Sequence, residues 1–263
     1  MSDSKSSAAP DVTPAPAAGA WFSRLVDIRA GEGSALACSF VFFFCVLCSY
    51  YIIRPLRDEM AVALGADFIQ QSFLISFLVM LAAVPVFGFI VARTPRRFIV
   101  PLVYGVFILC LAGFWMMHQR GRPSPMEARV FYIWVNVFSL FAPSLFWSAM
   151  SDAWATDQAK RLFGVISLGG TAGALSGPLL IQALLTFIGA DNFFMVSIFF
   201  LLIALIASLV LRRLASGAVH AASDRAEGGN ILTGAINVLC SPYLRRIAFW
   251  IFAANAAGIF FYL

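Results

Sequence analysis

The sequence predicts an all-α protein that crosses a lipid bilayer several times. Apolar residues make up 61% of the 263 positions and charged residues only 12%, whereas soluble domains are roughly 45–50% apolar and about 25% charged. The mean hydropathy is +0.89. Long uncharged runs recur along the chain, and a helix satisfies all its backbone hydrogen bonds without help from water. We therefore expect a polytopic helical protein whose surroundings are the lipid bilayer.

Apolar runs of membrane-spanning length define the expected helices. A helix needs about 20 apolar residues to cross the ~30 Å hydrocarbon core. The predicted complete spans are Ala35–Ile53, Phe68–Ala92, Phe98–Met117, Val130–Met150, Phe163–Ile188 and Phe193–Leu211. A further run begins near Ile247 and is still apolar at Leu263. The first run exceeds the roughly 7–15 residues of a signal-peptide core, so we interpret it as a retained helix.

The polar stretches between the runs divide the chain into four expected parts. Residues 1–20 are rich in Ala, Pro and Ser and predict a disordered tail. Residues 21–211 form the six-helix bundle, 212–246 a cytoplasmic linker with an interfacial helix, and 247–263 the start of a seventh span. Six helices, a long linker and a further helix are typical of a major-facilitator-type transporter truncated early in its second half.

Lysines and arginines predict the orientation, because cytoplasmic loops carry the excess of these residues. With a cytoplasmic N-terminus, 13 of the 18 basic residues lie inside. The five that lie outside are Arg54, Arg57, Arg120, Arg122 and Arg129. The net charge of +5 therefore reports topology, and no nucleic-acid partner is expected. Arg54 and Arg57 go against the bias, which suggests that something other than topology requires them.

A charged cluster follows the first span, in the sequence YYIIRPLRDEM at residues 50–60. Pro55 cannot continue a regular helix, so we expect Arg54, Arg57 and Asp58 at the outer end of this helix. An arginine near the bilayer centre costs about 2.5–3.5 kcal/mol or more and usually faces a cavity or a partner. Guanidinium groups also match phosphate oxygens. Two interpretations stay open here: an anion-binding site, or arginines that reach for lipid headgroups.

A second polar region joins the fourth and fifth spans. Asp152 lies at the inner end of the fourth span, with Lys160 and Arg161 just beyond it. These residues predict either an inner gate or a hydrated loop whose charges pair weakly. Within the fourth span, Asn136 and Ser139 fall near one face, where they are suited to line a cavity or to bond a neighbouring helix.

The fifth span carries Gly169, Gly173 and Gly177 at positions i, i+4 and i+8. This spacing puts the three glycines on one face of the helix, so the backbone of another helix can approach closely. We predict a helix-packing role for them, which overlaps with the smooth surface that moving transporter helices need.

Nothing in the sequence favours an enzyme. We find no nucleophile–base pair, no metal-ligand cluster and no phosphate-cradling loop, so neither a metal nor a cofactor is expected. Cys45 and Cys48 form a C-x-x-C inside an apolar run. We interpret them as small buried hydrophobic residues, because a thiolate or metal would be poorly solvated there.

Two motifs resemble those of the ATP/ADP translocases, the bacterial and plastid nucleotide transporter family. The first is the aromatic run followed by Arg54, Arg57 and Asp58, and the second is FWSAMSDAWATDQAKRLF, which begins at Phe146 and contains Asp152. SPYLRRIAFW, residues 241–250, resembles the start of the seventh helix of that family. The resemblance implies a twelve-helix major-facilitator-like fold that exchanges ATP, ADP or related nucleotides. It also implies transport roles for Arg57 and Asp152.

The expected function is therefore secondary transport of an anionic or phosphorylated metabolite, foremost a nucleotide, by alternating access. The substrate-binding residues expected are Arg54, Arg57, Asp58, Asn136, Asp152, Lys160 and Arg161. We expect a monomer in a bacterial inner membrane, with a cytoplasmic N-terminus. The alternative is a divergent membrane protein that does not transport nucleotides and acts as a scaffold or sensor, or an inactive fragment.

Overall fold

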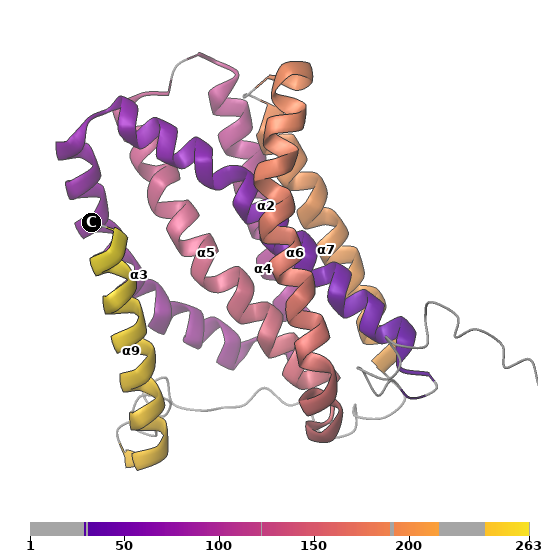
Figure 1. Cartoon of the computed structure of the whole chain (residues 1–263). Helices are drawn as coiled ribbons and strands as arrows, with labels where there is room; N and C mark the ends of the chain where they lie inside the picture. Colours follow the sequence, from indigo (N-terminus) through magenta and orange to yellow (C-terminus); the bar gives the residue numbers. More distant parts are fainter. Residues whose placement is uncertain (1–28, 30, 122, 190–191, 216–239, 263) are drawn as a thin grey trace, which may run out of the picture.

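The computed structural model describes residues 29, 31–121, 123–189, 192–215 and 240–262, and all regular elements in these ranges are helices (Figure 1). They are α2 (Gly33–Ala63), α3 (Ala66–Arg93), α4 (Arg96–His118), α5 (Pro125–Ala153), α6 (Thr156–Ile188), α7 (Phe193–Ala215) and α9 (Pro242–Tyr262). The first six of these are long and apolar enough to cross a membrane. The predicted all-α polytopic fold is confirmed. The predicted tail and most of the predicted linker lie outside the described residues.

Several helices are longer than their apolar runs. Helix α2 continues through Pro55 and ends at Ala63, so the expectation that Pro55 closes the helix is wrong. Helix α6 begins at Thr156 and therefore includes Lys160 and Arg161, which were expected to precede it. Apolarity marks the lipid-embedded part of a helix, whereas the helix itself continues until its backbone hydrogen bonding stops. Proline removes one such bond, and a membrane helix tolerates this loss.

Other boundaries also differ from the apolar runs. Helix α7 runs to Ala215 and helix α9 starts at Pro242, so the helical segments flanking the predicted linker extend into it. Helix α5 starts earlier than predicted because Ser124 caps it: its hydroxyl accepts from the Glu127 amide at 3.3 Å, and the Glu127 carboxylate accepts from the Ser124 amide at 2.7 Å. This reciprocal capping box satisfies two backbone donors that a helix start otherwise leaves unpaired.

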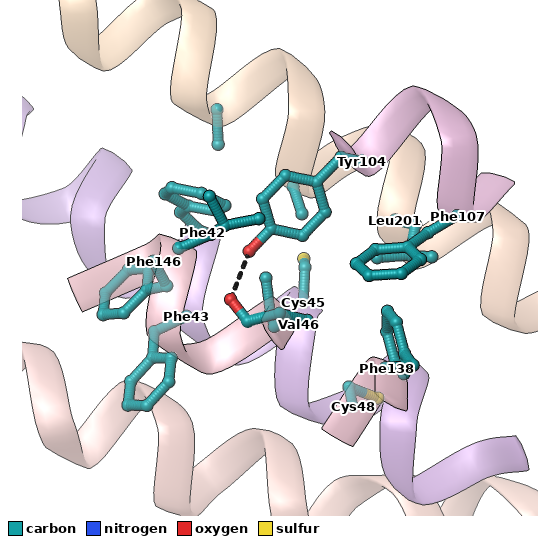
Figure 2. Close-up of a cluster of buried hydrophobic side chains, with 14 of the residues drawn as sticks. Phe42, Phe43, Cys45, Val46, Cys48, Tyr104, Phe107, Phe138, Phe146 and Leu201 are labelled. Atoms are coloured by element: carbon teal, nitrogen blue, oxygen red, sulfur yellow. Dashed lines mark hydrogen bonds between the residues drawn. The ribbon is translucent and has the colours of Figure 1, made fainter. Parts of the chain in front are cut away.

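Helix α2 is the central helix of the bundle and packs against α6, α7, α5 and α3. Figure 2 shows the core where its middle turns meet α4, α5 and α7. Phe42 is fully buried there, with its ring 5.7 Å from that of Tyr104 and 5.0 Å from that of Phe146. Cys45 and Cys48 are buried in the same core, which agrees with their interpretation as small hydrophobic residues.

Two hydrogen bonds tie α2 and α5 to their neighbours across this core. The Tyr104 hydroxyl on α4 donates to the backbone carbonyl of Ala142 on α5 at 2.8 Å (Figure 2). Ser49 on α2 and Ser197 on α7 are both fully buried, and their hydroxyl oxygens lie 2.6 Å apart. Such bonds contribute to helix association within a bilayer, because a polar group there cannot hydrogen-bond to water instead.

The glycine face of α6 lies directly against α2. Gly169, Gly173 and Gly177 are all buried. A Cβ atom at Gly169 would come 2.6 Å from the Phe40 carbonyl oxygen, and one at Gly177 would come 2.7 Å from the Cβ of Tyr51. A Cβ at Gly173 would overlap the Phe44 carbonyl. The close approach of α2 and α6 therefore depends on the absence of side chains at these positions.

Candidate functional site

The predicted substrate-binding residues do not form a single site. We call the end of the bundle at which α2 begins the inner end and the opposite end the outer end, after the predicted orientation. Asn136 and Asp152 both lie on α5, and 16 residues of helix separate them by about 24 Å. Arg54, Arg57, Asp58 and Asn136 gather in the outer half, whereas Asp152, Lys160 and Arg161 lie at the inner end.

Arg57 is the centre of the outer group, which we call the arginine cluster (Arg54, Arg57, Asp58 and Asn136). Its Nη1 donates to the Asn136 side-chain oxygen at 2.7 Å, and its Nε and Nη2 both donate to Oδ1 of Asp58 at 2.9 and 2.6 Å. The guanidinium lies 5.1 Å from the ring centroid of Tyr132. Only 13% of the side chain is exposed. Arg57 is thus a nearly buried cation held from two helices, α2 and α5.

The guanidinium of Arg57 points into the interior of the bundle. Asn136 also connects Arg57 to α3, because its Nδ2 donates a hydrogen bond to the Ser76 hydroxyl at 3.0 Å. Asn136 and Ser76 both lie about 15 Å, roughly three helical turns, from the outer starts of α5 and α3. A side chain that snorkels to headgroups points toward the helix end instead. The geometry of Arg57 therefore fits a partner inside the bundle.

Arg54 is the more exposed arginine of the cluster. It lies one turn from Asp58 on the same helix, and its Nε is 3.9 Å from Oδ2 of that carboxylate. The exposed fractions of the Arg54 and Asp58 side chains are 37% and 45%. Both arginines were expected at the end of the first helix, but α2 continues beyond them to Ala63. The cluster therefore rests on a regular helix, which fixes the spacing of its members.

Three participants near the cluster were missed in the sequence. Ser76 and Tyr132 contact Asn136 and Arg57, as described above. Arg129, one turn before Tyr132 on α5, donates from Nη2 to Gln71 at 3.2 Å and lies 5.2 Å from the Phe68 ring. Helical spacing could have signalled Arg129 and Tyr132, since residues 129, 132 and 136 fall on one face of α5. Ser76 lies on α3, and no sequence signal links it to Asn136.

A second ionic contact closes the inner end between the starts of α2 and α6. The Glu32 carboxylate accepts from Gln158 Nε2 at 2.8 Å, from Arg161 Nη2 at 3.1 Å and from the Arg29 amide at 3.0 Å. Sequence reasoning missed Glu32, although it is the last acidic residue before the first apolar run. Lys160 is exposed, and Asp152 lies half-buried near the end of α5. We call the contact of Glu32, Gln158 and Arg161 the inner clasp.

The hydrogen bonds of the inner clasp favour the ionised form of Glu32. The Arg29 amide is the largest cause that lowers the pKa of Glu32 below its ordinary value of 4.5, followed by the Gln158 side chain, and the charge of Arg161 acts in the same direction. Burial opposes these effects. Because the folded pKa is depressed, the clasp stabilises the fold above the ordinary pKa and loses this contribution as pH falls through the folded value.

Glu32→Gln is expected to lower the unfolding midpoint at pH 7 by about 2–4 °C, the effect of roughly 1 kcal/mol in a protein of this size. The difference from wild type is expected to shrink from about pH 4.5 downward and to vanish below the lowered pKa of folded Glu32, because only there is the wild-type carboxyl protonated in the folded protein as well. Thermal unfolding of the detergent-purified protein between pH 3.5 and 7.5 measures this. Glu59→Gln, which changes an exposed glutamate on α2, is the matched control. A pH-independent difference would contradict the clasp.

No protein-family model, no curated protein and no solved structure matches this chain. The assignment to the ATP/ADP translocase family therefore stays a prediction that rests on the two sequence motifs. The structure itself gives a bundle of helices long and apolar enough to cross a membrane. Within that bundle it places a nearly buried arginine beside a half-exposed carboxylate.

Proposed function

We propose that this chain belongs to a secondary transporter of anionic, phosphorylated metabolites, foremost nucleotides, which works by alternating access in a bacterial inner membrane with a cytoplasmic N-terminus. The observation that carries the proposal is Arg57, a cation whose guanidinium lies inside the bundle on Asn136 and Asp58. A charge that is nearly buried inside a bundle of membrane-spanning helices is costly and usually marks a substrate or ion pathway.

The chemistry of the arginine cluster suits a phosphoryl group. A guanidinium offers planar, paired donors that match two oxygens of a phosphate at once. Nε and Nη2 of Arg57 form such a pair, and both now point at a single carboxylate oxygen, Oδ1 of Asp58. Asp58 is 45% exposed, and in the proposal a soluble anion reaches Arg57 by taking the place of this carboxylate. Arg54, one turn away, lies 3.9 Å from the other oxygen of Asp58.

The packing of α2 against α6 supports movement of helices around this cluster. The α2 atoms nearest to Gly169, Gly173 and Gly177 are two backbone oxygens and the Cβ of Tyr51. Such a surface has few interlocking side chains to hinder small rotations, which alternating access requires. In the proposal, Asp152, Lys160 and Arg161 meet the substrate at the inner end, where α5 and α6 adjoin.

Uptake of labelled metabolites by bacterial cells that express the complete gene tests the proposal. We expect ATP and ADP to enter at least about tenfold faster than in cells with empty vector, and uncharged adenosine to enter no faster. Asp152→Ala is expected to reduce uptake without loss of protein from the membrane. If neither ATP, ADP nor inorganic phosphate enters, the proposal is wrong, and a membrane scaffold or sensor becomes the better interpretation.

A further inference from the structure

The Asp58 carboxylate lies between the two arginines of the cluster and contacts each through a different oxygen. Oδ1 accepts from Nε and Nη2 of Arg57 at 2.9 and 2.6 Å, whereas Oδ2 lies 3.9 Å from Nε of Arg54. We propose that Asp58 is an internal counter-ion, which occupies Arg57 in the empty transporter and transfers to Arg54 when a substrate anion takes its place. This inference rests on the proposed transport function.

Helix geometry makes Arg54 the alternative partner of Asp58, although the Arg57–Asp58 contact is the shorter one in this structure. Neighbouring residues on a helix point about 100° apart, whereas residues four apart lie on the same face. Asp58 must therefore lean sideways to reach Arg57, and Arg54 is the partner that its position on the helix favours. The 3.9 Å separation from Arg54 is short enough that a rotation of the Asp58 side chain closes it.

Arg57 is held in place by contacts that do not involve Asp58. Its Nη1 donates to Asn136 at 2.7 Å, and its guanidinium lies over the Tyr132 ring. Departure of Asp58 thus leaves Nε and Nη2 free without releasing the side chain. Arg57 is 13% exposed, while Asp58 and Arg54 are 45% and 37% exposed. The cluster therefore combines a fixed cation with a carboxylate that has room to move.

Competition with Asp58 selects for a class of substrate. A free monocarboxylate carries the same single charge as Asp58 and is not tethered beside Arg57, so it gains little by replacing that carboxylate. A phosphoryl group with two accepting oxygens and more than one negative charge forms the paired, charge-assisted contact that the guanidinium prefers. The negative charge of Asp58 is then balanced by the positive charge of Arg54. The structure assigns Asp58 the role of a selectivity residue for phosphoryl groups over monocarboxylates.

A double-mutant cycle with ADP as the probe tests this assignment. Equilibrium binding of labelled ADP to the detergent-purified full-length protein gives Kd for each variant. Asp58→Asn is expected to tighten binding about three- to tenfold and to let acetate compete. Arg54→Gln is expected to weaken binding by a similar factor, because Asp58 then has no alternative partner. In the Asp58→Asn background, Arg54→Gln is expected to have no further effect.

Two results would overturn the counter-ion role. One is weaker ADP binding in Asp58→Asn, and the other is an equal effect of Arg54→Gln in both backgrounds, which would make Arg54 a direct ligand. Glu59→Gln removes an exposed carboxylate next to the cluster and is expected to bind ADP like wild type. The unfolding midpoint of each variant separates the binding effect from misfolding. Binding with additive effects overturns this inference alone. Absence of ADP and phosphate binding in wild type and Asp58→Asn alike overturns it together with the transport proposal.

Discussion

Arg57→Ala is expected to lower nucleotide uptake by about 10- to 150-fold. The variant removes the charged hydrogen bonds that we propose form with the substrate, and bonds to charged groups contribute about 1.5–3 kcal/mol. It also removes the guanidinium that donates hydrogen bonds to Asn136 and Asp58 in the wild-type protein. Uptake of labelled ATP and ADP, normalised to the amount of protein in the membrane, measures the effect.

Two further variants test whether the effect of Arg57→Ala is specific to the guanidinium and to this position. Arg57→Lys keeps the charge but loses the paired donors, so we expect a stable protein with uptake well below wild type. Arg97→Ala removes an exposed arginine at the inner start of α4, which lies over the Phe98 ring, and is expected to leave uptake unchanged. If Arg57→Ala transports as fast as Arg97→Ala per folded molecule, the arginine cluster is not the substrate site.

Gly173→Ala is expected to lower the unfolding midpoint by about 4–10 °C, although alanine is the better helix former by about 1 kcal/mol. The added methyl group would overlap the backbone of Phe44 on α2, and backbone cannot rotate away as a flexible side chain can. Forcing an extra carbon into such a backbone contact costs about 3 kcal/mol or more, so the net loss after the gain in helix propensity is about 2 kcal/mol or more. Each kcal/mol shifts the midpoint by roughly 2–4 °C. Thermal unfolding in detergent measures the change.

Gly164→Ala on the same helix is the matched control for this substitution. Gly164 is exposed, and a Cβ there would meet no atom within 4 Å. Only the helix propensity changes at that position, so the midpoint is expected to stay the same or to rise by about 2–4 °C. Equal midpoints for the two variants would mean that α2 and α6 do not pack as closely as the structure places them.

Part of the candidate site could be predicted because its residues are close in the sequence. Arg54, Arg57 and Asp58 lie within two turns of one helix, and their mutual contacts follow from helical spacing. The partners on other helices could not be predicted in this way. Asn136 follows Arg57 by 79 residues, and an isolated polar residue in an apolar run is equally suited to face a cavity, a lipid or another helix.

At the inner end, too, the partners on other helices could not be predicted from the sequence. The sequence predicts charges near Asp152, Lys160 and Arg161, but Arg161 pairs with Glu32, 129 residues earlier. Ion pairs between helices depend on which ends come together and how far each helix continues past its apolar run. Those lengths were underestimated at α2 and α6, because polar turns beyond the lipid still form regular helix.

The sequence by itself determined the membrane-spanning all-α fold and the glycine face of α6. Both depend on local properties, namely the length of apolar runs and the helical period of small residues. The tertiary structure decided that α2 lies at the centre, that Arg57 turns inward to Asn136, and that the predicted site residues divide between the two ends of the bundle. Those outcomes depend on the packing of helices far apart in the chain, which no local pattern encodes.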